Sequence, residues 1–427
     1  MTANEKYSFN EINKVIKEID KISVARLYDF IDATIEIEEI NEDKLNLKFS
    51  VIESDKFFVN KVDIFGNNVT EEKVIRNQLE VDEGDPFNKL LHAKSLNNLK
   101  ALRIFEDVKD EIIPIPNSQQ KDIKITVQEK PTGEILASAG IGNDGGTVGF
   151  SVSEKNFMGR GIGLVSSLTL SEERVKGEFT VNNPNFNFTE KSLSTSVFAI
   201  NTDKMTDSGY DSSEVGFSFG TRFEQYDNLF FSPSFRTVAE KLETNSLASS
   251  SIKKQEGSYF DTTIDYSLLY DKRDQSFRPT DGFITNFFQS IPLNVDQNQT
   301  FINGYEITNF SEYLENQVLT ISFFAKAATS LGDDDVRISD RLYIPSKKLR
   351  GFVSGKVGPI DGGDYIGGNY VTSFNASADL PIFQSLETID FNLFYDAANV
   401  WGVDYNSAIN DSSALRSATG LGVDWYT

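Results

Sequence analysis

The sequence predicts an α+β N-terminal part followed by an antiparallel β-barrel that crosses a membrane with its strands. Helical and strand-like patterns mix up to about residue 131, and helical patterns disappear from Thr132 onward. The 427 residues include 34 Phe and 15 Tyr, although only 39% of the chain is hydrophobic. No apolar run approaches the roughly 20 residues that a membrane-spanning helix needs. An aromatic-rich, moderately polar chain is typical of a barrel whose strands alternate between lipid and lumen.

Composition excludes several classes of protein. The net charge is −23, which disfavours a nucleic-acid binder because phosphate contacts need clustered cations. The absence of cysteine excludes disulfide scaffolds, thiol catalysis and Cys-based zinc sites. The only histidine is His92, so a Ser-His-Asp triad or a His-rich metal site is disfavoured. We interpret His92 as a residue on the flank of a helix. We therefore expect no enzyme.

The first 54 residues are expected to form a helix and a hairpin. Apolar residues recur at helical spacing, at Ile12, Val15, Ile16 and Ile19. Residues 33–40 and 44–53 then alternate with period two around a polar turn, which predicts two paired strands.

The next segment, residues 55–131, predicts the order β-α-α-β-β. The expected elements are a strand at 57–66, helices at 70–79 and 84–102, and strands at 105–113 and 122–131. Asp85 is the expected N-cap of the second helix, with Pro86 in its first turn. We interpret residues 1–54 as the last portion of an equivalent unit.

Residues 132–427 contain about fourteen alternating segments, many near the ~10 residues of a tilted membrane strand. In "EVGFSFGTRF", Val215, Phe217 and Phe219 point to one side, while Gly216 and Ser218 point to the other. A soluble sandwich would also alternate. The barrel is favoured because Ser, Thr, Asn or Gly occupies the second face of many segments and aromatic residues lie near their ends.

Several motifs, taken in order, resemble a known family. They are "VDIFGNNVTEEKVIR" with "LKALRIFEDV", "EKNFMGRG", "DKRDQSFRPTDGF", "LRGF" and "FYDAANVW". The chain resembles the BamA-type family of outer-membrane protein insertases, which have POTRA domains followed by a sixteen-stranded barrel. The resemblance covers essentially the whole chain. The barrel-signature residues that it implies are Asn156, Phe157, Gly159, Gly161, Asp271, Arg273, Asp274, Pro279 and Gly282.

The resemblance also implies the domain organisation. Residues 1–54 would be the C-terminal portion of a POTRA, 55–131 a complete POTRA adjacent to the barrel, and 132–427 a barrel with about fourteen of the sixteen strands. Residues 331–368 would form a long inward loop. The chain is expected to be an internal segment of a longer secreted precursor, with the barrel in the bacterial outer membrane and the POTRA domains in the periplasm.

The implied site lies on that loop, in the motif formed by Leu349, Arg350, Gly351 and Phe352. In the family the loop folds back into the lumen, so Arg350 is expected to pair with Asp396, and Asp379 is a second proposed partner. A guanidinium away from bulk water needs such acceptors, since losing its partner costs about 3–5 kcal/mol. On the residues alone, a cation in a surface loop remained the alternative.

The implied function is the folding and insertion of β-barrel proteins without nucleotide, cofactor, metal or covalent catalysis. The implied partners are unfolded outer-membrane protein clients, accessory assembly lipoproteins at the POTRA domains, and outer-membrane lipid, with no nucleic acid. A POTRA sheet edge would hold an incoming strand, and the barrel seam would open laterally.

The expected first seam hairpin contains Gly140, Gly142, Gly145 and Gly146, and glycine in a strand weakens pairing. Ordinary turn and bulge glycines are the alternative there. The rival functions are a two-partner-secretion or translocation-type transporter of the same superfamily, and a passive outer-membrane channel.

Overall fold

The computed structural model describes residues 31–41, 44–53, 57–142, 145–189, 191–206, 208–293, 299–314, 317–332, 335–381, 389–403 and 414–425. The chain divides into two compact units. The first comprises Met1–Gly133 with Glu154–Ile162, and the second comprises Glu134–Ser153 with Gly163–Thr427.

The hairpin expected near the N-terminus is present. Strands β1 (Ile31–Asn41) and β2 (Lys44–Glu53) pair antiparallel. The helix predicted before them lies outside the described residues. That residues 1–54 are a portion of a POTRA is therefore still a proposal.

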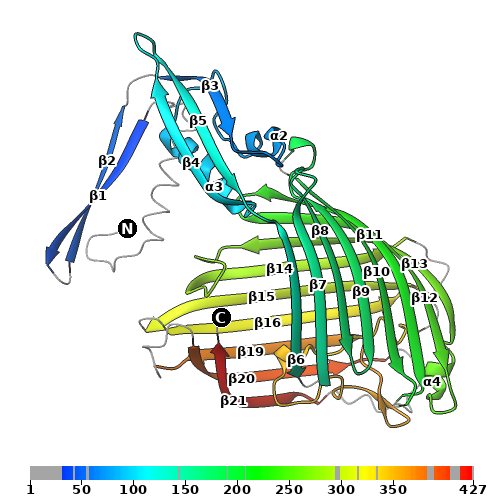
Figure 1. The fold of residues 1–427 in the computed structure, drawn as a ribbon. Coiled ribbons are helices and arrows are strands. Elements are labelled where there is room, and N and C mark those ends of the chain that lie inside the picture. The colour runs from blue at the N-terminus through cyan, green and yellow to red at the C-terminus, as the bar shows by residue number, and fades with distance from the viewer. Residues whose placement is uncertain are drawn as a thin grey trace. The chain divides into compact units, whose positions relative to one another are not determined.

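The order β-α-α-β-β predicted for the next segment is confirmed. A three-stranded mixed sheet has the order β3-β5-β4, in which β3 is parallel and β4 antiparallel to the central β5. Two helices lie between β3 and β4 in the chain (Figure 1). The bounds are β3 (Phe58–Phe65), α2 (Glu72–Arg76), α3 (Lys89–Ala101), β4 (Phe105–Pro114) and β5 (Gln120–Glu129).

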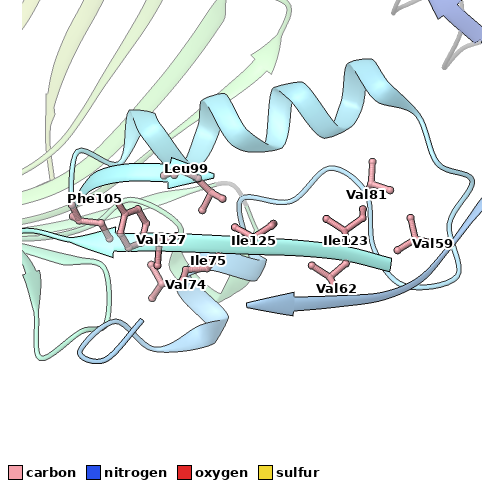
Figure 2. Packing of buried hydrophobic residues seen from close by; sticks show 12 residues of the cluster. Val59, Val62, Val74, Ile75, Val81, Leu99, Phe105, Ile123, Ile125 and Val127 are labelled. Carbon is pink, nitrogen blue, oxygen red and sulfur yellow. The ribbon is translucent and has the colours of Figure 1, made fainter. Parts of the chain in front are cut away.

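The helices cover the sheet through an apolar core. Alternate residues of β5, Ile123, Ile125 and Val127, present one face to Leu99 of α3 and Ile75 of α2 (Figure 2). The period of two on the strand and the apolar residues of both helices therefore build one shared core. No helix in the described ranges is long and apolar enough to cross a membrane.

The start of the second helix differs from the prediction. Helix α3 begins at Lys89, and the side-chain oxygen of Asn88 accepts a hydrogen bond of 3.2 Å from the backbone N–H of Leu91. Asp85 does not cap it, because its carboxylate accepts a hydrogen bond of 2.9 Å from the N–H of Asp82. Its backbone carbonyl accepts one of 2.9 Å from the N–H of Val59. Backbone pairing with β3 therefore holds the first predicted turn extended.

In the described part of the second unit, fourteen strands form one continuous antiparallel sheet (Figure 1). One continuous sheet excludes the alternative of a two-sheet sandwich, and the fold class predicted from the sequence is confirmed. The strands are β6 (Gly133–Gly142), β7 (Gly145–Phe157), β8 (Ile162–Ser171), β9 (Arg174–Asn183), β10 (Ser192–Lys204), β11 (Tyr210–Tyr226), β12 (Leu229–Thr244), β13 (Gly257–Asp271), β14 (Asp281–Pro292), β15 (Thr300–Leu314), β16 (Gln317–Ser330), β19 (Tyr370–Asp379), β20 (Ile389–Trp401) and β21 (Arg416–Trp425).

Each strand pairs with its neighbours in the chain, and one long loop interrupts the series. Residues 331–369 lie between the paired strands β16 and β19. This loop contains the short turn η3 (Ser346–Lys348) and a small hairpin, β17 (Ile360–Asp361) and β18 (Asp364–Tyr365). Two other short helical turns, η1 (Phe186–Phe188) and α4 (Ser250–Lys253), lie between strands.

The two faces of the sheet differ in polarity. On β11, Val215, Phe217 and Phe219 are exposed, as the alternation predicts. The other face presents Gly216, where a Cβ would lie 2.2 Å from the ring of Phe198 on the paired strand β10. Glycine is therefore required at this position by the ring that covers it. We call the face with exposed aromatic residues the outer face and the opposite one the inner face.

Candidate functional site

The long loop packs on the inner face of the sheet. On β20, Leu393 and Tyr395 are exposed on the outer face, whereas Asp396 has the opposite parity and is fully buried. The loop and the strands share a cluster of buried apolar residues, which includes Val336, Leu342, Ile344, Leu349 and Val357 of the loop and Phe324, Val371, Ala398 and Val400 of the strands. The sequence-based expectation that the loop folds inward agrees with this packing.

Arg350 and Asp396 lie in direct contact. The Nε of Arg350 donates to Oδ2 of Asp396 at 2.7 Å, and Nη2 donates to Oδ1 at 2.7 Å. The backbone N–H of Arg350 adds a third hydrogen bond to Oδ2, at 3.0 Å. The two side-chain hydrogen bonds form the bidentate geometry in which a guanidinium binds a carboxylate most strongly. The Asp396 side chain has 0% exposure, against 35% for Arg350.

Two further side chains complete this site, which we call the Arg350 site. Asn375 of β19 donates from Nδ2 to Oδ1 of Asp396 and to the carbonyl of Lys348, both at 2.8 Å. The guanidinium carbon of Arg350 lies 3.6 Å from the ring centroid of Phe394, a cation–π contact. Asn375 and Phe394 were not identified from the sequence. The two-residue spacing of Phe394 from Asp396, which places both on one strand face, was the signal available.

The neighbours of Arg350 fix the loop backbone. Leu349 is buried in the apolar cluster, and Phe352 packs against the same cluster. Gly351 has φ +82°, in the left-handed region that glycine adopts without strain. The motif thus anchors the loop through two apolar side chains on either side of one charged contact.

Asp379 is not a partner of Arg350, so this proposed pairing is wrong. In the register of β19 with β20, Asn375 is opposite Asp396, whereas Asp379 is opposite Asn392. Four residues of strand correspond to about 13 Å, which is beyond the reach of the contact. The Asp379 carboxylate instead accepts a hydrogen bond of 3.1 Å from the backbone N–H of Val318.

A second arginine, which is buried, anchors the loop near its start, and the sequence analysis missed it. Arg337 forms ion pairs with Glu240 of β12 and with Asp340, each at 3.3 Å, and with Asp261 of β13. Its guanidinium carbon lies 4.5 Å from the ring centroid of Tyr259. The contacts with Glu240, Tyr259 and Asp261 join segments 76 to 97 residues apart in the chain, for which a single sequence carries no local signal.

The first barrel-signature segment, residues 156–161, packs on residues 69–74 within the first unit. Asn156 donates from Nδ2 to the hydroxyl of Thr70 at 2.9 Å, and its Oδ1 accepts from the N–H of Gly161 at 2.7 Å. A Cβ on Gly159, whose φ is +72°, would lie 1.9 Å from the carbonyl oxygen of Val69. Glycine is therefore required at 159. Phe157 is exposed.

The second barrel-signature segment forms a hydrogen-bonded turn, residues 272–280, between β13 and β14. Arg273 donates to both oxygens of Asp271, at 2.8 and 2.7 Å. The Asp274 carboxylate accepts from the N–H and hydroxyl of Thr280, at 3.0 and 2.7 Å. Burial alone would raise the pKa of Asp274, but these hydrogen bonds lower it below its usual value. Pro279 lies within the turn.

Gly282 follows this turn and closes it. Its φ is +93°, and a Cβ there would lie 2.2 Å from the carbonyl oxygen of Lys272. A substitution at Gly282 would therefore be strained in both backbone conformation and space.

The four glycines of the expected seam hairpin lie at the ends of two strands. Gly140 and Gly142 are in β6, and Gly145 and Gly146 are in β7. A Cβ on Gly140 or Gly146 would meet no atom within 4 Å. No steric contact among the described residues requires glycine at these two positions. A role in weak strand pairing is still a proposal.

A carboxylate organises the loop before α2. Glu129, at the end of β5, accepts hydrogen bonds from the backbone N–H groups of Asn68, Val69 and Thr70, at 2.9, 3.0 and 2.6 Å. Burial would raise the pKa of Glu129, but these hydrogen bonds lower it overall. Asn156 binds the same loop through the hydroxyl of Thr70.

Two family descriptions match the chain. The Omp85 superfamily domain matches residues 156–427, and the surface antigen variable number repeat, or POTRA, matches residues 57–130. The chain is 25% identical over 405 residues to the outer membrane protein assembly factor BamA of Neorickettsia risticii, covering 93% of this chain and 54% of the relative. It is 25% identical over 410 residues to BamA of Neisseria meningitidis serogroup B, covering 86% and 50%. The chain thus spans about half the length of the curated relatives it matches.

Solved structures show the same fold. BamA from Haemophilus ducreyi lacking POTRA domains 1–3 superposes with a TM-score of 0.74 at 18% identity, covering 100% of this chain and 89% of that chain. CdiB from Acinetobacter baumannii gives a TM-score of 0.55 at 12% identity, covering 96% and 75%.

The family matches cover both units, and the Omp85 domain covers well over half of the chain. The expectation that the chain is not an enzyme agrees with these matches, which are to an assembly factor. The chain belongs to the Omp85 superfamily and is related to BamA, with a β-barrel in the outer membrane and a POTRA unit in the periplasm.

Proposed function

We propose that this protein is the central component of an outer-membrane machine that folds and inserts β-barrel proteins. The POTRA unit would capture a client strand, and the barrel would offer a strand edge at a seam that opens laterally. Its partners would be unfolded outer-membrane protein clients, accessory assembly lipoproteins at the POTRA domains, and outer-membrane lipid. No nucleotide takes part in these steps.

The physical problem is the client's backbone. An unpaired N–H or C=O group costs several kcal/mol in the hydrocarbon core of a bilayer. A protein that pairs those groups before and during entry lowers this barrier without any covalent step. Strand addition to an exposed sheet edge is the corresponding recognition mode.

The observation that carries the proposal is the open edge of the POTRA sheet. The order β3-β5-β4 leaves β4 at one edge. The N–H of Ile115 bonds to the carbonyl of Gln120 across the hairpin, and the register continues with Ile113 opposite Asp122. Because hydrogen bonding alternates along an antiparallel strand, the N–H of Ile112 points away from β5. Within the described part of the chain no backbone group pairs with this N–H, which makes it a template position for an incoming strand.

The edge of β3 contrasts with this. The segment before α3 bonds to it at Val59, whose N–H donates to Asp85 and whose carbonyl accepts from Gly84 at 2.8 Å. The N–H of Val62 donates to the side chain of Glu83 at 3.1 Å. Much of this edge is therefore satisfied within the unit, which favours β4 as the client-binding edge.

The test uses the full-length protein in liposomes with a urea-unfolded barrel client, whose folding is followed by heat-modifiable gel migration. We expect faster folding than in empty liposomes. Ile112→Pro removes the N–H that points away from β5 and should slow the folding of the client. The matched control Ile112→Ala keeps this N–H and should not slow it. Folding no faster than in empty liposomes, together with ion conductance, would favour a passive channel instead.

A further inference from the structure

Two arginines bind carboxylates on the inner face of β20, at two positions along the strand. Asp390, Asn392, Phe394 and Asp396 share this face because they are spaced by two residues. Asp396 binds Arg350 of the long loop. Asp390, about 20 Å further along the strand, binds Arg278, whose Nη2 donates to both carboxylate oxygens at 2.8 and 2.7 Å. None of the family motifs described above assigns a role to Arg278 or Asp390.

Arg278 reaches β20 from a distant part of the sheet. It lies in the turn 272–280, which precedes β14, and β15, β16 and β19 separate β14 from β20. Four strand spacings amount to about 19 Å along the sheet. One side chain cannot cover that distance, so the turn itself must project over the inner face toward β20.

The turn is built to hold Arg278 in this position. Asp274 ties its two ends together through Thr280, and the N–H of Asp274 donates to the carbonyl of Asp281 at 3.1 Å. Gln275 donates from Nε2 to the carbonyl of Arg278 at 2.6 Å. Arg278 itself has φ +50° directly before Pro279. A non-glycine residue persists in this conformation only where its surroundings fix it.

Asp390 lies beside a second carboxylate, which favours a cation at this position. Asp390 is directly opposite Asp424 of β21. Like charges opposite each other destabilise an antiparallel pair. Asn392 donates from Nδ2 to Asp424 at 2.7 Å, and Arg278 supplies the opposite charge to Asp390. The contact thus supports the pairing of β20 with β21.

We propose that Arg278 and Asp390 form a releasable contact that holds the turn 272–280 over the inner face at the end of the barrel where β20 begins, and that stabilises the β20–β21 pair. The signature residues of this turn act as positioning residues for Arg278. The two arginines are similarly exposed, at 36% for Arg278 and 35% for Arg350, and the two contacts differ at the carboxylate. Asp390 is 24% exposed, so water reaches it and can replace the arginine, whereas Asp396 is fully buried. The inference does not rest on the proposed function.

Proximity is tested first, in the full-length protein. This chain has no cysteine, so engineered thiols are unambiguous within it. The pair Arg278→Cys/Asp390→Cys, treated with a short bifunctional maleimide in liposomes, should give an internal crosslink. The matched control Gln275→Cys/Asp390→Cys uses the same turn and should crosslink several-fold less. Equal yields from the two pairs would overturn the placement of Arg278.

The role of the charges is tested by ion conductance in planar bilayers. Arg278→Glu or Asp390→Arg alone should raise the conductance, because the turn is no longer held over this end of the barrel. The swapped double variant should return it toward the wild-type value, and Arg278→Lys should lie between. Unchanged conductance in the single variants, or no recovery in the swap, would overturn the proposal. If a charge reversal prevents folding, the neutral variant Arg278→Gln carries the same expectation.

Discussion

The POTRA unit and the fourteen-stranded sheet place the same kinds of side chain on opposite sides. In the POTRA unit, Ile75 and Leu99 have 0% exposure and lie between the helices and the sheet. In the large sheet, Val215 is 61% and Phe217 is 38% exposed, on the face opposite the loop. The first arrangement suits water outside, and the second suits lipid outside.

This difference indicates what holds each unit together. The POTRA unit is stabilised by apolar burial, as a water-soluble domain is. A barrel in lipid gains little stability from apolar burial on its outer face. Contacts inside the barrel must therefore hold the loop in place. There the apolar cluster around Leu349 is joined by two arginine contacts, at Arg337 and Arg350, with carboxylates of the strands.

Leu99→Ala is expected to give the largest effect, because it removes a fully buried side chain from the POTRA core. The expected loss in the free energy of unfolding of this unit is about 2–5 kcal/mol. Calorimetry of the full-length protein should show a lower transition temperature for the POTRA unit. Leu96→Ala, a partly buried neighbour on α3, should cost less. Equal losses would contradict the assigned core.

Phe217→Arg tests whether the outer face meets lipid. A cation on that face costs about 2–4 kcal/mol at the middle of the bilayer. Ser218→Arg, one residue along on the inner face, removes a hydroxyl contact with Ser196 that is worth about 1 kcal/mol. Denaturant titration in liposomes should rank the two variants in this order. The reverse ranking would mean that the faces are assigned the wrong way round.

Gly159→Ala is expected to destabilise the contact between residues 156–161 and 69–74. The left-handed conformation alone costs about 1–2 kcal/mol for a residue with a Cβ, and the Cβ would also press on the carbonyl of Val69. Gly140→Ala has open space, so it should be close to neutral or slightly stabilising. Thermal unfolding of both variants checks this, and similar losses would leave the packing at Gly159 without support.

The smallest effect is expected from Glu129, and it depends on pH. Its pKa is lower in the folded protein than in the unfolded chain. The carboxylate therefore stabilises the fold above its unfolded pKa, and this contribution is lost as the pH falls through the lower, folded value. Glu129→Gln should lower the transition temperature of the POTRA unit at neutral pH and not in strong acid. A difference that is constant with pH would show that the charge is not involved.

Strand patterns and motif order predicted most of the fold. Alternation was sufficient for strands such as β11, because one lipid-facing side imposes a strict period of two. Helix α3 began later than predicted, since Asp85 and Pro86 fit a helix start locally but pair with β3. A tertiary contact decided that boundary.

The site was predictable only in part. The motif order implied Arg350 and Asp396, and the structure brings them together. Asp379 was a wrong choice because the register between β19 and β20 follows from backbone pairing, not from spacing in the sequence. Arg278 and Asp390 are separated by 112 residues, and the contact between them leaves no local pattern.

The most direct test of the account is a double-mutant cycle on Arg350 and Asp396. Unfolding of the wild type, Arg350→Ala, Asp396→Ala and the double variant would be measured in liposomes with denaturant. The contact geometry and the buried carboxylate predict a coupling energy toward the upper end of the range of about 0.5–3 kcal/mol found for residues in contact. For distant residues, the stability losses of two single variants add up to that of the double variant within about 0.5 kcal/mol. The same additivity here would contradict the claim that this pair fixes the loop inside the barrel.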